Sequence, residues 1–140
     1  VDAIKRLMTD TVVISSGGGG IPVYRDDDGK IHGLEAVIDK DRSGLKLAEQ
    51  VNADTFIMLT DVPNVYINYG KENEAKLENI SVEEAEQYGA EGQFPAGSML
   101  PKIQAAIEFA KTGKEAIICS LADAVDALEG KAGTRITLNK

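Results

Sequence analysis

The segment TFIMLT at residues 55–60 determines how the rest of the chain is interpreted. It is a short run of apolar, β-branched and aromatic residues, and the turn-forming sequence DVPN at residues 61–64 ends it, so it predicts a buried strand. Further strand runs are predicted at residues 11–15 (TVVIS), 36–38 (AVI), 65–69 (VYINY), 115–119 (EAIIC) and 134–138 (TRITL).

Amphipathic stretches alternate with these strand runs. Apolar residues at helical spacing predict helices over residues 41–51, 81–89, 98–110 and 121–128, and SVEE at residues 81–84 is a capping box. Residues 22–32 predict a β-hairpin because Asp28-Gly29 suits a turn that needs positive φ, whereas residues 70–79 read as a polar loop. Strands that alternate with helices are typical of an α/β fold with a largely parallel sheet.

Composition limits the class of protein and its partners. A length of 140 residues fits one ordinary domain, and no apolar run approaches the roughly 18 residues that span a bilayer. The net charge of −8 argues against a nucleic-acid partner, which needs a basic face. Cys119 is the one cysteine, so we expect no internal disulfide and a cytoplasmic location; it reads as a core residue, and His32 reads as an exposed turn residue.

The first residues suggest a chain that begins inside a structural element. The sequence opens with VDAIKRLM, without an initiator methionine, and Ile4, Leu7 and Met8 already form an apolar stripe in helical phase. We therefore expect the sequence to be a fragment.

Three segments follow predicted strands, which is where ligands bind in open α/β sheets. The glycine run at residues 17–20 lets backbone N–H groups approach an anion, although a flexible turn is the simpler alternative. Lys40 stands between two aspartates just before a helix and could face a phosphate, or the cluster could be a solvated cap. Gly97 and Ser98 precede a helix whose first turn holds Lys102, a cation that the helix dipole disfavours unless an anion binds there.

Together these segments resemble the carbamate kinases of the amino acid kinase family. The resemblance runs from about residue 12 to residue 136 and keeps the order and spacing of the family. It rests on SGGGGIPV (16–23), EAVIDKD (35–41), LTDV (59–62), VYINYGK (65–71), GQF (92–94), GSM (97–99), PK (101–102) and GKAGT (130–134). Two positions depart from the family pattern, the order of Pro95-Ala96 and the large residue Leu100.

The resemblance implies a three-layer α-β-α sandwich with a mainly parallel sheet. It implies reversible phosphoryl transfer between ATP and carbamate, giving ADP and carbamoyl phosphate, in arginine breakdown. Residues 1–140 would be the C-terminal ATP/ADP-binding portion, inactive alone, without the N-terminal half that holds most of the carbamate site. Mg²⁺ would be carried by the nucleotide phosphates, the partners would be these small molecules, and the parent enzyme would be a homodimer.

The resemblance also implies roles for individual residues. Asp41 would organise the catalytic lysines, and Lys40 and Lys102 would neutralise charge on the transferred phosphoryl group. The nucleotide would be bordered by Thr60, Asp61, Val62, Tyr66, Tyr69, Gly97, Ser98 and Met99, with the tyrosines near adenine or ribose and Met99 on the base. The acceptor side of the γ-phosphate would face Gly17, Gly18, Gly19 and Gly20. Two alternatives remain, a non-catalytic nucleotide-binding or structural remnant and a related kinase with another acceptor.

Overall fold

The computed structural model describes residues 1–17 and 20–139. The chain folds as two compact units, which we call unit 1 (Val1–Asn52) and unit 2 (Ala53–Lys140).

Unit 2 is built on a four-stranded sheet in the order β3-β7-β8-β6. Its strands are β3 (Thr55–Thr60), β7 (Glu115–Ser120), β8 (Thr134–Thr137) and β6 (Asn79–Ser81). β3 runs parallel to β7, and β6 runs parallel to β8, whereas β7 and β8 are antiparallel. In the parallel pair Thr60 lies opposite Ser120, so β3 and β7 end at the same edge of the sheet.

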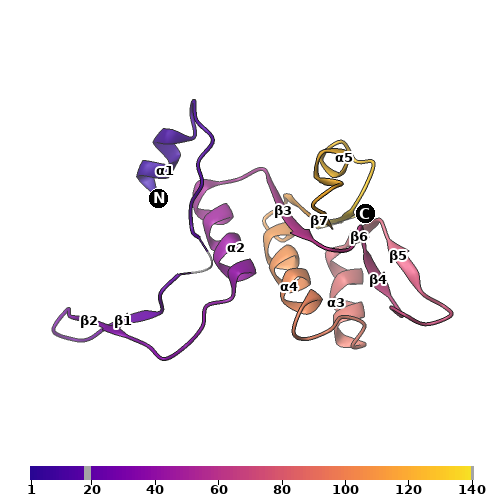
Figure 1. Ribbon diagram of the computed structural model, residues 1–140, viewed down its shortest axis with the longest axis horizontal. Coiled ribbons are helices and arrows are strands. Elements are labelled where there is room, and N and C mark those ends of the chain that lie inside the picture. The colour runs from indigo at the N-terminus through magenta and orange to yellow at the C-terminus, as the bar shows by residue number, and fades with distance from the viewer. Residues whose placement is uncertain (18–19, 140) are drawn as a thin grey trace. The chain divides into compact units, whose positions relative to one another are not determined.

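Helices cover both faces of this sheet (Figure 1). α3 (Val82–Ala90) and α4 (Met99–Ala110) lie side by side on one face, and α5 (Ala124–Leu128) lies on the other. The capping box predicted at the start of α3 is present, because Ser81 Oγ accepts from the Glu84 N–H while the Glu84 carboxylate accepts from the Ser81 N–H. This layering confirms the predicted α-β-α fold class with a mainly parallel sheet.

The core of unit 2 lies where α4 packs on β7. The α4 side chains that face inward are fully or almost fully buried: Ile103, Ala105, Ala106, Ile107, Phe109 and Ala110. The three alanines let the helix axis approach the sheet closely, and α4 therefore has a fixed position relative to the strand edge.

A second, two-stranded antiparallel sheet in unit 2 consists of β4 (Val65–Ile67) and β5 (Ala75–Leu77). Residues 70–79 were expected to be a loop, and that expectation is wrong, since this range contains β5 and the first residue of β6. β5 and β6 are each three residues long, which is too short to show a periodic pattern in the sequence. The strand predicted at residues 65–69 is present as β4, whereas β5 was not predicted from the local sequence.

Unit 1 contains α1 (Asp2–Leu7), a hairpin of β1 (Val23–Arg25) and β2 (Ile31–Gly33), and α2 (Lys40–Val51). The hairpin prediction is confirmed, and Gly29 adopts the positive φ of 82° that its turn requires. His32 is not an exposed turn residue as expected. It is half-buried in β2, its ring stacks on Tyr24 with centroids 5.1 Å apart, and its Nε2 lies within hydrogen-bond distance of the Asp26 carboxylate.

Two strands predicted in unit 1 are not formed. Residues 11–15 and 36–38 form no strand, and Val12 and Ile14 are 92% and 98% exposed. The strand propensity of a residue reflects how well its side chain fits a half-buried surface beside other strands. Residues with high strand propensity therefore form a strand only where a neighbouring strand can pair with them. Within the described residues neither segment has such a neighbour.

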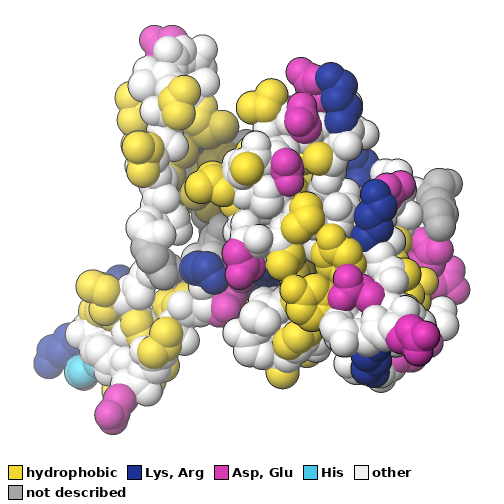
Figure 2. Space-filling model, turned by 45° about the vertical axis from the view of Figure 1, so that its right-hand side comes forward, with side chains coloured by type: hydrophobic (Ala, Val, Ile, Leu, Met, Phe, Trp, Pro, Cys, Tyr) yellow, Lys and Arg dark blue, Asp and Glu magenta, His cyan; other side chains and the backbone are white. Residues whose placement is uncertain are grey.

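The surface carries charges of both signs together with apolar side chains. Figure 2 shows acidic and basic side chains interspersed over the visible face, with hydrophobic side chains between them. Among the helices of the described residues, none is long and apolar enough to cross a membrane. Cys119 is buried as predicted, and burial raises the pKa of its thiol.

Close packing around Gly133 gives a first test of the fold. A Cβ at this position would lie 2.9 Å from the Cys119 Cβ and 3.1 Å from the Ile118 carbonyl oxygen, and φ is +78°. Gly133→Ala should therefore lower the free energy of unfolding by about 3 kcal/mol, from overpacking plus left-handed strain. Urea denaturation followed by circular dichroism measures this loss.

Gly113→Ala is the matched control for Gly133→Ala. Gly113 has a similar φ of +86°, but its Cβ would meet nothing within 4 Å. The free energy of unfolding of this variant should therefore fall by only about 1 kcal/mol, from left-handed backbone strain alone. Equal losses in the two variants would show that packing at Gly133 is not tight.

The β1–β2 hairpin gives a test of pH dependence. The hydrogen bond from His32 is the largest influence on Asp26 and, with backbone N–H groups of the turn, holds the pKa of its carboxyl below the usual 3.8. Because the folded-state pKa is lowered, the stabilising contribution is present above about pH 3.8 and is lost as pH falls through the lowered value. In an NMR titration the Asp26 midpoint should rise in His32→Phe, which keeps the ring but removes the hydrogen bond. An unchanged midpoint would contradict this origin of the shift.

Candidate functional site

The carboxyl edge of the β3 and β7 pair gathers most of the predicted site residues of unit 2. α4 packs on β7 and is joined to its start by residues 111–114, so α4 begins at the edge where β7 ends. The β4–β5 hairpin follows the end of β3 and leaves from the same edge. Edges of this kind are where open α/β sheets bind ligands.

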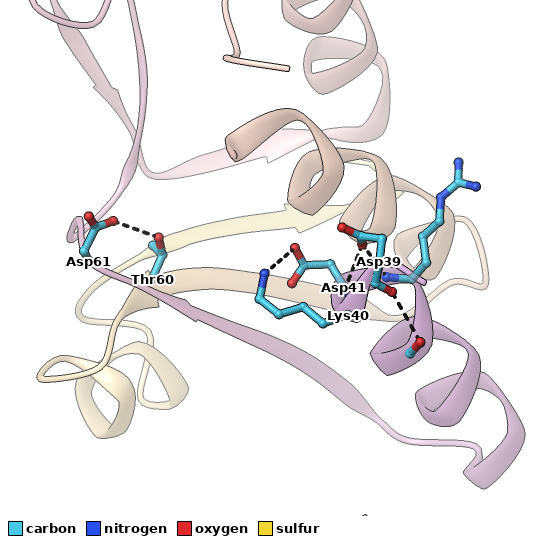
Figure 3. A network of polar contacts seen from close by, with 7 residues as sticks. Asp39, Lys40, Asp41, Thr60 and Asp61 are labelled. Carbon is cyan, nitrogen blue, oxygen red and sulfur yellow. Dashed lines mark hydrogen bonds and ion pairs between the residues drawn. The ribbon is translucent and has the colours of Figure 1, made fainter. Parts of the chain in front are cut away.

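The end of β3 presents three of these residues. The Thr60 hydroxyl donates a hydrogen bond to the Asp61 carboxylate over 3.1 Å (Figure 3). Asp61 is exposed, and Val62 is half-buried beside it. A carboxylate at this point can accept hydrogen bonds from hydroxyl or amino groups of a ligand.

The β4–β5 hairpin brings the two predicted tyrosines together. The Tyr66 and Tyr69 rings have centroids 5.7 Å apart and an interplanar angle of 57°. Tyr66 is half-buried at the centre of β4, and Tyr69 is exposed just beyond the strand. The pair offers aromatic surface and two hydroxyl groups at this edge.

Two buried polar side chains, which we call the brace, hold the base of the hairpin. The Asn64 amide donates to the carbonyl oxygens of Leu77 (3.0 Å) and Gly133 (2.6 Å). The Thr134 hydroxyl accepts from the Val65 N–H (2.8 Å) and donates to the same Leu77 oxygen (2.5 Å). Val65 and Leu77 are register partners, so this hydroxyl connects the two strands and ties them to β8.

A polar cavity of about 140 Å³ lies next to the brace. Its lining includes Asn64, Asn79, Gly133 and three cations, Lys76, Lys131 and Arg135. Each cation is paired with a carboxylate, that of Glu78, Glu129 and Glu115 respectively. Glu78 itself lines the cavity, whereas Glu129 and Glu115 compensate their partners from outside the lining.

The start of α4 holds four of the predicted residues. Ser98 is the N-cap as predicted, but its side chain makes no capping hydrogen bond, and Leu100 instead donates its N–H to the Pro95 carbonyl oxygen over 3.0 Å. Gly97 and Ser98 are exposed, and Met99 is half-buried. Lys102 lies in the first turn and is only 8% exposed, a buried cation at the positive end of the helix dipole.

A hydrogen bond that the sequence did not predict joins the hairpin to the segment before α4. The Asn68 N–H donates to Gln93 Oε1 over 2.9 Å. Gln93, Asn64 and Thr134 were recognised only as members of motifs or as turn formers. Their partners are 13 to 69 residues away in the sequence, so no local pattern reveals these contacts.

Unit 1 holds the remaining predicted residues. Asp39 caps α2, accepting from the N–H groups of Asp41 (2.9 Å) and Arg42 (3.0 Å), and this cap sets the direction of the first turn. Lys40 Nζ lies 3.5 Å from the buried Asp41 carboxylate (Figure 3), and the roles of these two residues stay predictions.

The glycine run is described only at its ends. Gly17 and Gly20 are exposed and have positive φ values of 45° and 128°, which few residues other than glycine adopt. Gly18 and Gly19 lie outside the described residues. Over residues 1–17 and 20–139, no group of three or more histidine, cysteine, aspartate or glutamate side chains could hold a metal ion.

Comparison with known proteins identifies the family. The family model described as "Amino acid kinase family" matches residues 1–120. The chain belongs to the amino acid kinase family.

Carbamate kinases are among the curated relatives and the solved structures that resemble the chain. The chain is 55% identical over 138 residues to the carbamate kinase of Pyrococcus horikoshii and 50% identical over 141 residues to that of Trichomonas vaginalis. These matches cover 97% and 99% of this chain but 44% and 45% of the relatives. The structure of the Giardia lamblia carbamate kinase bound to AMP-PNP matches with a TM-score of 0.92 and 50% identity, over 97% of this chain and 48% of that one. The resemblance predicted from the sequence is confirmed, and the chain spans less than half the length of these relatives.

The brace provides a test of how the hairpin is held. Thr134→Val removes the hydroxyl and leaves the buried Val65 N–H without its acceptor, which should cost about 1–3 kcal/mol of stability. Hydrogen exchange should accelerate at the Val65 amide, and urea denaturation reports the change in free energy.

The control is Thr137→Val on the same strand. The Thr137 hydroxyl donates to the Asn139 carbonyl oxygen in an exposed contact, so its loss should cost about 0.5 kcal/mol. If Thr134→Val were no more costly than Thr137→Val, the brace would not stabilise the hairpin.

Proposed function

We propose that this chain is the nucleotide-binding part of a carbamate kinase, a phosphotransferase acting between ATP and carbamate. The observation that carries the proposal is the match to the Giardia lamblia enzyme bound to AMP-PNP, which extends over 97% of the chain at 50% identity. Because the chain spans less than half the length of its relatives, we propose that the isolated chain binds nucleotide but does not catalyse transfer.

The nucleotide in this proposal lies at the carboxyl edge of β3 and β7. Tyr66 and Tyr69 offer aromatic surface to adenine or ribose, and Met99 packs on the base. Thr60, Asp61 and Val62 form the adjoining border at the end of β3. Gly97 and Ser98 present backbone groups to the phosphates, supported by the unused capping position at the start of α4.

Three charged residues have proposed roles in phosphoryl transfer. Lys102 neutralises phosphate charge, and its place in the first turn of α4, close in sequence to Gly97 and Ser98, supports this role. Lys40 provides a second positive charge, and Asp41 holds the lysines in position, as its contact with Lys40 supports. The glycine run, which includes Gly17, Gly18, Gly19 and Gly20, faces the acceptor side of the γ-phosphate.

The proposed reaction is a direct in-line displacement. A carbamate oxygen attacks the γ-phosphorus of ATP, the bond from this phosphorus to the bridging oxygen breaks, and ADP leaves with that electron pair. Mg²⁺ bound to the nucleotide phosphates supplies charge neutralisation, as is usual for this ion with phosphate ligands. Protein residues position the reactants and stabilise charge, and the reverse direction makes ATP from carbamoyl phosphate.

We propose further that the partners are these small molecules, that the parent enzyme is a cytoplasmic homodimer, and that it serves arginine breakdown. The family match and the names of the relatives support the class of small-molecule substrate, and the other points rest on the resemblance to the family. A non-catalytic nucleotide-binding fragment is the alternative, and it shares the binding step tested below.

A calorimetric titration of the chain with Mg·ADP tests nucleotide binding. We expect one-to-one saturation, and Lys102→Ala should weaken affinity about 10- to 100-fold, since hydrogen bonds to charged groups contribute about 1.5–3 kcal/mol. Lys111→Ala is the matched control, because Lys111 follows the other end of α4 and pairs with Glu86 at the surface. It should leave affinity unchanged.

Two results would contradict the proposal. A folded wild-type chain that does not bind Mg·ADP would remove the nucleotide assignment for this chain. Equal Mg·ADP affinity of the wild type and Lys102→Ala would contradict the proposal that Lys102 binds the phosphates. Circular dichroism of each variant shows whether it is folded.

A further inference from the structure

Two segments border the proposed nucleotide, and they are distant in sequence. One consists of β4, which carries Tyr66, and the residues just after it, which include Tyr69; the other is the segment that leads into α4. The Asn68 N–H donates to Gln93 Oε1 over 2.9 Å, and this hydrogen bond, which we call the strap, joins them across 25 residues. We propose that Gln93 is a positioning residue that holds the tyrosines in register with the start of α4. The inference rests on the proposed nucleotide site and adds a residue to it.

The Gln93 end of the strap is fixed by the core. The Gln93 N–H donates to the Tyr88 carbonyl oxygen in the last part of α3 over 3.0 Å, and the next residue, Phe94, is buried. Gln93 itself is half-buried. Its backbone therefore moves with α3, and its amide oxygen is a fixed acceptor rather than the end of a mobile surface chain.

The Asn68 end lies between the two tyrosines in the sequence. Asn68 follows β4, so its N–H is outside the β4–β5 ladder and takes Gln93 as its acceptor. It has a positive φ of 53°, its side-chain Nδ2 donates to the Asn73 carbonyl oxygen over 3.3 Å, and its backbone carbonyl oxygen accepts from the Lys71 N–H. A backbone held in this way at residue 68 orients the side chains on either side of it.

The brace and the strap act at opposite ends of β4. The brace ties the base of the hairpin to β8 through Thr134 and Asn64, whereas the strap ties the end of β4 to the segment before α4. Loss of the strap should therefore leave the hairpin folded but free to shift the tyrosines relative to Gly97 and Ser98. A ligand that contacts both segments should sense this shift, and a ligand that contacts only the start of α4 should not.

The test compares Gln93→Met with Gln87→Met in the full chain. Methionine has a similar length and no strong acceptor, and the side chain of Gln87 on α3 makes an exposed hydrogen bond to Glu91. Calorimetry should show that Gln93→Met weakens Mg·ADP binding about fivefold, the effect of one typical hydrogen bond, with Mg·diphosphate binding unchanged. Hydrogen exchange should accelerate at the Asn68 amide, and Gln93→Glu, which keeps an acceptor, should restore its protection. Gln87→Met should match the wild type.

Each other outcome overturns the inference in a distinguishable way. Equal Mg·ADP affinity of Gln93→Met and the wild type removes the positioning role while the nucleotide site stands. Parallel losses of Mg·ADP and Mg·diphosphate affinity with a lower unfolding midpoint make Gln93 a residue of general stability. A wild-type chain that binds neither ligand removes the proposed site and the inference together.

Discussion

Burial of β7 on both faces is the constraint on which unit 2 depends. Residues 116–119 are at most 1% exposed, because α4 covers one face of the strand, α5 covers the other, and β3 and β8 pair with its two edges. A strand buried in this way must be apolar throughout, as Ala116, Ile117, Ile118 and Cys119 are. The start of α4, including the buried Lys102, takes its position at the carboxyl edge from the packing of this helix on β7.

Polar contacts then place the hairpin relative to that core. Asn64 and Thr134 are buried, yet each is satisfied by backbone groups, so they contribute orientation at little desolvation cost. At the other end of β4, the Gln93 side chain likewise accepts a hydrogen bond from a backbone group, the Asn68 N–H. Residues that belong to separate sequence motifs, VYINYGK, GQF and GKAGT, are in this way parts of one connected arrangement.

The elements that could be predicted from the sequence are those whose formation depends on residues close together in the chain. β3, β7, α4 and the capping box at Ser81 follow from apolar runs, periodicity and capping chemistry, and the proximity of Lys40 and Asp41 follows from adjacent positions at a helix start. The strand expected at residues 11–15 failed because strand formation needs a paired neighbour, which no local sequence supplies. β5 escaped prediction because three residues are too few to show a periodic pattern, whereas the brace and the strap escaped it because their partners are distant in sequence. The family resemblance identified the motifs of the site but not the hydrogen bonds between them.

The brace has a consequence for how the protein is made. Asn64 and Thr134 belong to one network but are separated by about 70 residues, which a ribosome adds in roughly 4 to 14 s at about 5–20 residues per second. During this interval β4 and β5 can pair, but a two-stranded hairpin is only marginally stable on its own. The tyrosines therefore acquire their final anchorage only after residue 134 has emerged. Nascent chains that lack β8 should expose this hairpin to chaperones and proteases, even with β3 and α4 already synthesised.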